Sequence, residues 1–279
     1  MTQTPPVLDP SQPVRYEHFR DGRLRRTKRN LAEEVALEIL VNGRPYSLLM
    51  ETPGHEMELV YGYLFTEGLI DTPSQVSRVI LQKGPDFLGA EGLQALAELP
   101  GQKESDALPD RLSISLSSCG LCGKDGLDQV GRGIGRVHSR QRFSWTILSG
   151  LATDLRNHQP LYEETRGVHA VAVYDAHGTF LSCFEDVGRH NALDKAVGHA
   201  LLKNITLDDK MVILSGRASL EMILKAARAG IPLFLCFSNP TALAIEAAKS
   251  LNITLVSRES DHSLAAYTHT RRIEEESPK

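Results

Sequence analysis

Cysteine and long apolar runs are what this sequence of 279 residues has least of. Its four cysteines are too few and too scattered to form a disulfide framework, so we expect the protein to work in a reducing cytoplasm. No uninterrupted apolar segment approaches the roughly 18 residues that a membrane span needs. The stretch from Met1 to Pro13 is polar and proline-rich and lacks the apolar centre of a signal peptide. The sequence therefore predicts a cytoplasmic protein without a membrane partner.

An excess of positive charge is also lacking. Lysine and arginine number 31 against 35 acidic residues, and the formal net charge of −4 argues against general nucleic-acid binding. The remaining composition, with 41% hydrophobic and 24% charged residues, is ordinary for a globular protein. The length is sufficient for one large domain or two smaller ones around a packed core.

The first 30 residues differ from the rest of the chain. Prolines are followed there by a basic run, at Pro5, Pro6, Pro10 and Pro13 and then at Arg23, Arg25, Arg26, Lys28 and Arg29. We interpret residues 1–30 as a flexible tail. A solvated run of charge is the simpler interpretation of the basic residues, and contact with an acidic partner or a ligand phosphate is the alternative.

Residues 31–150 are expected to form a smaller N-terminal α+β part. Val35 to Val41 has the composition of a strand, Asn42-Gly43 is a turn signal, and a second strand follows around Tyr46 to Met50. Apolar residues at helical spacing predict a helix between Pro53 and Leu69. Residues 82–110 are rich in glycine, proline and charge, so we expect a loop or insertion there.

Residues 151–279 show a more regular order and are expected to form an α/β domain that binds the ligand. Strand-like and helical patterns alternate along this part, with strands at 169–174, 179–184, 211–214, 232–237 and 253–256 and helices around 192–201, 219–229 and 242–250. Short apolar strands that alternate with helices indicate βαβ units. We therefore predict a parallel or mixed sheet with helices on both faces.

Two loops of this domain connect the end of a strand to the start of a helix, Ser215 to Ser219 and Ser238 to Thr241. Ligands of open α/β sheets bind at the carboxyl ends of the strands, and a helix N-terminus favours an anion. The guanidinium group of Arg217 is suited to phosphate. Helix capping by Ser219 and Thr241 is the structural alternative. Together the two loops favour a phosphate-bearing ligand.

The segment E-D-V-G-R-H-N-A-L-D-K, Glu185 to Lys195, places many charged groups directly after an apolar strand. Arg189 could bind an anion, and Asp186 could accept a hydrogen bond from a base or pterin N–H. His190 has an ordinary pKa near neutrality and could move a proton. A salt-bridge network with a purely structural role is the alternative.

A pair of thiols lies in S-S-C-G-L-C-G, Ser117 to Gly123, after alternating apolar and serine residues that predict a strand. Lys124 and the start of a helix after Gly126 would both favour the thiolate, which is the nucleophilic form of cysteine. Cys119 and Cys122 are therefore candidates for covalent sulfur chemistry.

A C-x-x-C pair has three other uses in proteins. A structural zinc site needs two further ligands, and the remaining cysteines, Cys183 and Cys236, lie apart in apolar strands. A zinc deaminase is excluded because no histidine is followed two positions later by glutamate and Ser118, not proline, precedes Cys119. Thiol–disulfide exchange is the serious alternative, although the motif lies far from the N-terminus. A ligand crevice nearby favours sulfur transfer through a persulfide.

Several motifs together closely resemble one family. S-S-C-G-L-C-G-K, E-D-V-G-R-H-N-A-L-D-K and S-G-R-A-S-x-E-M, with G-Y-L-F-T-E-G-L-I and Y-T-H, are similar to the pattern of the formate dehydrogenase accessory sulfurtransferases, the FdhD/NarQ family. The resemblance covers roughly residues 31 to 270. It implies a cytidine-deaminase-like fold without the zinc site and a cytoplasmic sulfur carrier that forms a homodimer.

The resemblance also implies partners and a reaction. A cysteine desulfurase would supply sulfur to Cys119 as a persulfide, with Cys122 assisting. The acceptor would be the molybdenum cofactor in its bis(molybdopterin guanine dinucleotide) form, which is then inserted into formate dehydrogenase. GDP would mimic the nucleotide ends of this acceptor.

The stretch that binds the cofactor in the family maps to Arg258, Glu259, Ser260, Asp261, His262 and Ser263. The family pattern usually has two arginines and a glycine there, whereas this chain has one arginine and two acids. We retain these residues as candidate contacts because they follow a predicted strand end of the same sheet.

Overall fold

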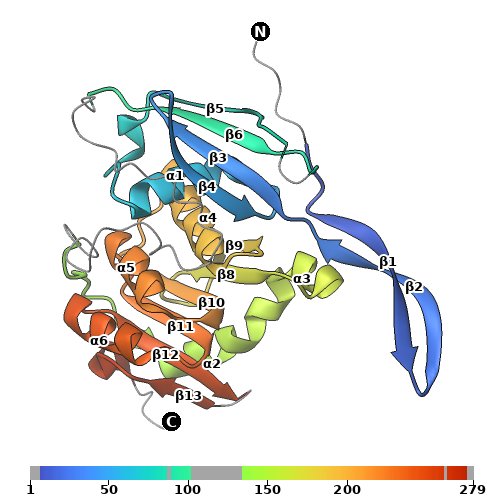
Figure 1. Cartoon of the computed structure of the whole chain (residues 1–279). Coiled ribbons are helices and arrows are strands. Elements are labelled where there is room, and N and C mark those ends of the chain that lie inside the picture. Colours follow the sequence, from blue (N-terminus) through green and yellow to red (C-terminus); the bar gives the residue numbers. More distant parts are fainter. Residues whose placement is uncertain (1–6, 87–88, 102–133, 261–262, 275–279) are drawn as a thin grey trace.

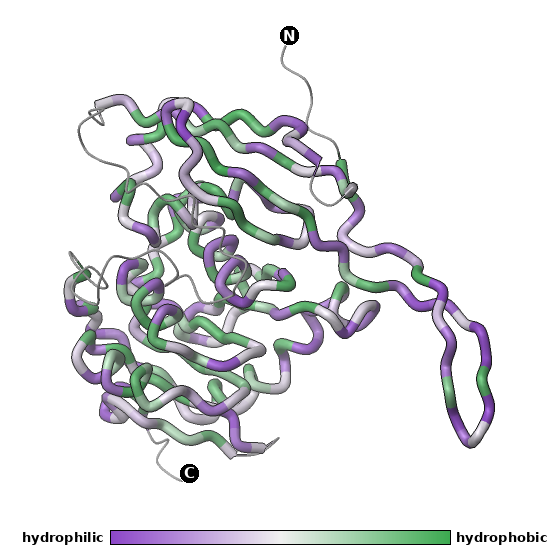
Figure 2. The backbone as a smooth tube through the Cα atoms, viewed as in Figure 1, coloured by the Kyte–Doolittle hydropathy of each residue, from purple (hydrophilic) through white to green (hydrophobic). Residues whose placement is uncertain are grey.

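A computed structural model describes residues 7–86, 89–101, 134–260 and 263–274 of the chain. Within these ranges the main body contains a six-stranded and a four-stranded sheet, and a long two-stranded hairpin projects from it (Figure 1). None of the helices in this described part combines the length and apolar character needed to cross a bilayer. Figure 2 shows hydrophobic residues along the strands of both larger sheets and hydrophilic residues along much of the hairpin.

The six-stranded sheet has the order β13-β12-β11-β10-β8-β9. Its strands are β8 (His169–Tyr174), β9 (Phe180–Asp186), β10 (Met211–Arg217), β11 (Leu233–Ser238), β12 (Thr254–Ser260) and β13 (Ser263–Ala266). β10, β11 and β12 are parallel, whereas β8, β9 and β13 pair antiparallel with their neighbours. The predicted mixed sheet is confirmed.

Helices cover both faces of this sheet, as predicted. The α4 (Arg189–Leu202), α5 (Leu220–Arg228) and α6 (Ala242–Leu251) helices pack on one face, around residues such as Val212 and Phe234. α2 (Trp145–Asp154) packs on the other face, around Met211 and Leu235, and is followed by α3 (Pro160–Thr165). Because adjacent residues of each strand point to opposite faces, a strand covered on both sides is apolar throughout.

The N-terminal part is a four-stranded sheet with one helix. The strand order is β4-β3-β6-β5, formed by β3 (Val35–Val41), β4 (Arg44–Glu51), β5 (Arg78–Lys83) and β6 (Leu93–Glu98). The helix α1 (Glu56–Thr66) packs on it, and Asn42-Gly43 forms the predicted turn with positive φ at both residues. The short strands β7 (Phe143–Ser144) and β14 (Ile273–Glu274) pair with each other elsewhere.

The two sheets are joined through a close crossing of α1 and α4. Gly62 of α1 and Gly198 of α4 face each other, and a Cβ atom on either would overlap backbone atoms of the opposite helix, at Asp194 and Glu58 respectively. The absence of side chains at these two positions lets the helices approach closely, so the N-terminal part packs directly on the α/β body.

The expectation of a flexible tail over residues 1–30 is wrong for most of that stretch. β1 (Ser11–Arg20) and β2 (Arg23–Ala32) form a hairpin in continuous antiparallel register. Asp21 and Gly22 between them have φ values of 52° and 73°, the left-handed pair that a two-residue hairpin turn requires. Asp-Gly between two strands is itself a strong hairpin signal, whereas the basic residues of β1 and β2 lack the apolar pattern of a buried strand.

The expectation of a loop over residues 82–110 is wrong for residues 93–98, which form β6. The glycines before β6 let neighbouring backbone segments approach closely: a Cβ atom on Gly84 would lie 2.7 Å from the backbone of Leu93. The expected boundary at residue 150 also falls inside α2, which packs with the C-terminal sheet. Residues 82–83 belong to the end of β5, and residues 87–88 and 102–110 of the predicted loop lie outside the described residues.

Candidate functional site

The carboxyl ends of β10 and β11 bring the two predicted anion-binding loops together. Arg217 and Ser238 are partners in the register of these strands. The hydroxyl of Ser215 accepts a hydrogen bond from the backbone N–H of Ala170 at 2.8 Å, which joins β10 to the start of β8. Ser215, Arg217 and Ser238 therefore share the sheet edge at which open α/β folds bind ligands.

The helices that follow these loops begin in different ways. The hydroxyl of Thr241 accepts a hydrogen bond from the N–H of Ala244 at 3.2 Å, so this residue caps α6. Ser219 makes no such bond at the start of α5, and its buried hydroxyl oxygen has no hydrogen-bond partner in the part of the chain that the structure describes. A buried hydroxyl is rarely left without a partner, so the start of α5 remains a candidate ligand contact.

A pocket of about 390 Å³ opens beside this edge. It combines basic, hydroxyl and aromatic side chains with the backbone between α3 and β8, and its lining residues are Arg156, Gln159, Tyr162, Arg166, Gly167, Val168, His169, Ser215 and Phe237. The volume falls within the range of small-molecule sites. Guanidinium groups next to aromatic rings suit a ligand that carries both phosphate and a planar ring.

The wall of the pocket formed by α3 is held in place by Glu185 at the end of β9. Its two carboxylate oxygens accept hydrogen bonds from the backbone N–H groups of Leu161 and Tyr162, at 2.9 and 2.8 Å. Arg166 closes this helix, with its guanidinium carbon 5.0 Å from the ring of Tyr162 and a nitrogen 2.7 Å from Glu163. Glu185 is thus a positioning residue for the pocket.

Arg258, the first residue of the predicted stretch 258–263, contacts a residue that lines the pocket. Its guanidinium carbon lies 4.9 Å above the ring of Phe237, a pocket residue. Ser260 and Ser263 pair across β12 and β13, and the hydroxyl of Ser263 donates to Glu259 at 3.2 Å. Asp261 and His262 lie outside the described residues.

Asp186 does not lie on the surface where a ligand could contact it. It is fully buried and lies 2.7 Å from the ammonium of Lys195, and it accepts hydrogen bonds from the backbone N–H groups of Thr52 and Gly188 and from Asn191. The interpretation of Asp186 as a ligand contact is wrong, because every position around its carboxylate is taken by the protein. The structural alternative, a buried salt-bridge network, accounts for it.

His190 is also buried. It is 8% exposed, and its Nε2 atom lies 3.2 Å from a carboxylate oxygen of Glu221. Burial, then the charges of Arg189 and Lys225, lower its pKa to about 3. His190 is therefore neutral at physiological pH, and the expected proton transfer near neutrality is not supported.

His169, which the sequence did not single out, lies with Arg189 at the pocket edge. A Cβ atom on Gly216 would lie 3.1 Å from Nδ1 of His169 and 3.8 Å from Cδ of Arg189, so the three residues are neighbours. Burial and Arg189 lower the pKa of His169. Arg189 therefore lies beside His169, a pocket residue, and its binding of an anion stays a prediction.

Most pocket residues were missed because they lie in a polar connecting segment. Arg156, Gln159, Tyr162 and Arg166 form no recognisable motif, and only the folded chain brings them to β8 and β10. The sequence offers only a weak signal there: two arginines, two histidines and one tyrosine between residues 156 and 169.

Cys119 and Cys122 lie outside the described residues. The other two cysteines are free thiols, Cys236 buried in β11 and Cys183 half-buried in β9. Burial raises the pKa of Cys183 to about 12 and that of Cys236 to about 11, so both stay protonated and unreactive. Within the described ranges, no group of three or more histidine, cysteine or acidic residues could hold a metal ion.

The model of the FdhD/NarQ family matches residues 32–274. Proteins named sulfur carrier protein FdhD are similar along nearly the whole length: that of Streptomyces avermitilis is 34% identical over 270 residues, covering 91% of this chain and 93% of the relative. That of Mycobacterium tuberculosis is 35% identical over 268 residues, covering 93% and 97%.

A crystal structure from Desulfotalea psychrophila, described as a formate dehydrogenase accessory protein, has the same fold. The TM-score is 0.72 at 21% identity, with 95% of this chain and 100% of that chain covered. The family match extends over both sheets and over every pocket residue named above. The chain therefore belongs to the FdhD/NarQ family.

Proposed function

We propose that this protein accepts a sulfur atom from a cysteine desulfurase and passes it to the molybdenum cofactor destined for formate dehydrogenase. The observation that carries the proposal is the basic pocket at the sheet edge, where Arg156 and Arg166 lie beside Tyr162 and Phe237. The names of the related proteins, sulfur carrier and formate dehydrogenase accessory protein, support the same function. The reaction would take place in the cytoplasm.

The acceptor would be a substrate with guanine nucleotide ends. A pocket of about 390 Å³ has room for one such end, not for the whole bis(molybdopterin guanine dinucleotide) molecule. The guanidinium groups of Arg156 and Arg166 are suited to the phosphates, and the rings of Tyr162 and Phe237 to the base. Arg217, Ser238 and Arg258, at the ends of neighbouring strands, would contact the remainder of the acceptor.

The chemistry is assigned to Cys119 on the basis of the sequence motif. Its thiolate would attack the outer sulfur of the desulfurase persulfide, forming Cys119–S–SH while the desulfurase cysteine leaves as thiolate. Attack by Cys122 on the inner sulfur would then form a Cys119–Cys122 disulfide and release the outer sulfur at the oxidation level of hydrosulfide, ready to bind the acceptor. The dithiol supplies the two electrons of this step.

Mass spectrometry tests the first step. After incubation with a cysteine desulfurase and cysteine, the wild-type protein should gain the mass of one sulfur atom, which a thiol reductant removes. Cys119→Ala should gain nothing, whereas Cys183→Ala, the matched control, should react like the wild type because the Cys183 thiol is protonated in β9. A sulfur adduct retained in Cys119→Ala would contradict the assignment.

A further inference from the structure

The lining of the pocket beside α3 differs between its solvent side and its protein side. Arg156 and Arg166 are exposed, whereas Gln159 and Val168 are only 4% and 6% exposed and His169 is half-buried. A ligand in this pocket therefore meets guanidinium groups toward the solvent and uncharged groups toward the protein interior.

Gln159 has a side-chain amide for which the protein supplies no hydrogen bond. The residue precedes α3, but its side chain does not cap that helix, and no other residue in the described ranges bonds to it. The amide is not among the polar atoms that are enclosed without a partner, so it reaches open space. Because Gln159 is otherwise buried and lines the pocket, that space is the pocket. Buried amides are normally hydrogen-bonded, and a ligand group is the partner that this amide lacks.

The other polar groups on the protein side of the pocket are also uncharged. Burial and the charge of Arg189 lower the pKa of His169, so its imidazole is neutral at physiological pH. The hydroxyl of Ser215 accepts a hydrogen bond from the N–H of Ala170 and still has its own proton to donate. Neutral donors and acceptors suit the polar edge of a base, whereas phosphates are drawn to the two exposed arginines.

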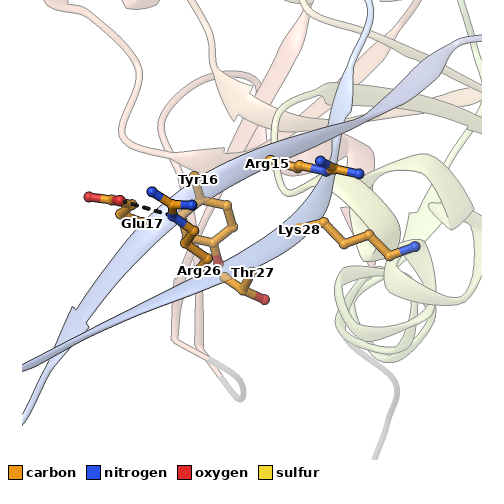
Figure 3. A pocket seen from close by; sticks show the side chains of 6 residues that line it. All are labelled: Arg15, Tyr16, Glu17, Arg26, Thr27 and Lys28. Carbon is orange, nitrogen blue, oxygen red and sulfur yellow. Dashed lines mark hydrogen bonds and ion pairs between the residues drawn. The ribbon is translucent and has the colours of Figure 1, made fainter.

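Another basic and aromatic hollow, of about 650 Å³, lies on the hairpin of β1 and β2 and lacks such a group (Figure 3). Its lining residues are Arg15, Tyr16, Glu17, Arg26, Thr27 and Lys28. Tyr16 is half-buried, and the other five are exposed. Glu17 also lies 3.4 Å from Arg26 and offsets part of the positive charge. None of these lining side chains is buried without a partner, so the hollow provides a control site rather than a second candidate.

We infer that the side chain of Gln159 hydrogen-bonds the base of the nucleotide end, which enters the pocket base first with its phosphates at the exposed arginines. The inference rests on the proposed function and adds to it a base-binding residue and an orientation. A carboxamide presents a donor beside an acceptor, so it forms two hydrogen bonds with the O6 and N1–H of guanine. Turned over, the same amide matches the N1 and N6–H of adenine.

Calorimetry with GDP and ADP on two variants of Gln159 tests the contact. Gln159→Leu should weaken the binding of both nucleotides roughly tenfold. Gln159→Glu presents acceptors alone, which match the N1–H and N2–H groups of guanine but not N1 of adenine. This variant should therefore keep the wild-type affinity for GDP and lose affinity for ADP roughly tenfold or more. The double variant Arg15→Ala, Lys28→Ala, in the hairpin hollow, is the matched control and should bind both nucleotides like the wild type.

Guanosine and pyrophosphate test the orientation separately. Gln159→Leu should weaken guanosine binding and leave pyrophosphate binding unchanged, whereas Arg166→Ala should do the reverse. A purely structural role of Gln159 would affect the two probes alike.

A loss of GDP affinity in Gln159→Glu as large as in Gln159→Leu would overturn the inference, because a carboxylate that repels the ligand would place the phosphates, not the base, at this residue. Wild-type affinity for GDP in both variants would overturn it as well. Either result leaves the proposed function in place, since the loading of sulfur on Cys119 is measured without nucleotide. A wild-type protein that binds neither GDP nor guanosine would overturn the inference together with the assignment of the pocket to the acceptor.

Discussion

At the scale of single residues, the segment Glu185 to Lys195 contributes both to the buried interior and to the surroundings of the pocket. Glu185 holds α3, Asp186 and Lys195 lie buried together, and Arg189 lies next to His169 at the pocket. The high density of charge in this segment is thus explained mostly by structure. Glu51 completes the buried group, 3.2 Å from the ammonium of Lys195.

Glu51 should make stability depend on pH. Complete burial raises the pKa of Glu51 from 4.5 to about 8; the nearby ammonium of Lys195 lowers this pKa only in part, and the charge of Asp186 raises it further. The folded protein therefore keeps a proton that the unfolded chain loses, and this contribution to stability disappears as pH rises from about 5 to 8. Glu51→Gln should lack this decline, so the free energy of unfolding of the variant relative to wild type should increase by up to about 1.4 kcal/mol per pH unit over this range.

Urea denaturation at several pH values measures this difference. Glu98→Gln, at an exposed position of β6, is the control and should follow the wild type at every pH. A difference between Glu51→Gln and wild type that stays constant from pH 5 to 8 would show that Glu51 is ionised in the folded protein.

The two pocket arginines should determine nucleotide affinity. Arg156→Ala and Arg166→Ala should each weaken GDP binding roughly tenfold or more, because a charge-assisted hydrogen bond contributes about 1.5–3 kcal/mol. Arg78→Ala in β5, outside the pocket lining, should bind GDP like the wild type. Calorimetry at two salt concentrations provides the measurement. Unchanged affinity in both pocket variants would place the nucleotide elsewhere.

At the scale of elements, the crossing of α1 and α4 depends on glycine. Gly198→Ala should destabilise the protein by about 3 kcal/mol, since the new methyl group would overlap the backbone oxygen of Glu58. Gly150→Ala, inside α2 with open space around it, is the matched control and should be neutral or stabilising by up to about 1 kcal/mol. Urea denaturation compares the two. Equal effects would mean that the helices tolerate a wider separation.

The elements of the second half could be predicted because apolar strands and amphipathic helices alternate there with clear turn residues. Strands 169–174 and 211–214 and the helix near 219–229 are confirmed. β6 and the hairpin of β1 and β2 could not be recognised by apolar pattern, since β6 lies among glycines and no residue of the hairpin is fully buried. The pocket could not be predicted either. Ser215 lies at an expected strand end, but Arg156 and Tyr162 come to line the same pocket only through tertiary packing.

At the scale of the whole molecule, buried charges join the two larger sheets into one unit. Lys225 of α5 lies 2.7 Å from Asp194 of α4 and 3.4 Å from Glu67, which follows α1. Its ammonium also donates to the hydroxyl of Thr66 at 2.9 Å. The charge of one buried ammonium thus stabilises carboxylates from both parts, and neither part can open without exposing or separating them.

The two sheets should therefore unfold together. Trp145 is the single tryptophan and packs with the six-stranded sheet, so its fluorescence follows that sheet, whereas far-ultraviolet circular dichroism follows the whole chain. The two denaturation curves should coincide.

Lys225→Met should shift both curves to lower urea by the same amount, equivalent to about 3–5 kcal/mol, because it leaves buried carboxylates unpaired. Lys249→Met, which removes an exposed ion pair with Glu246, should cost less than about 1 kcal/mol. If the circular dichroism curve of Lys225→Met showed a second, earlier step without a change in fluorescence, the N-terminal sheet would be an independent folding unit.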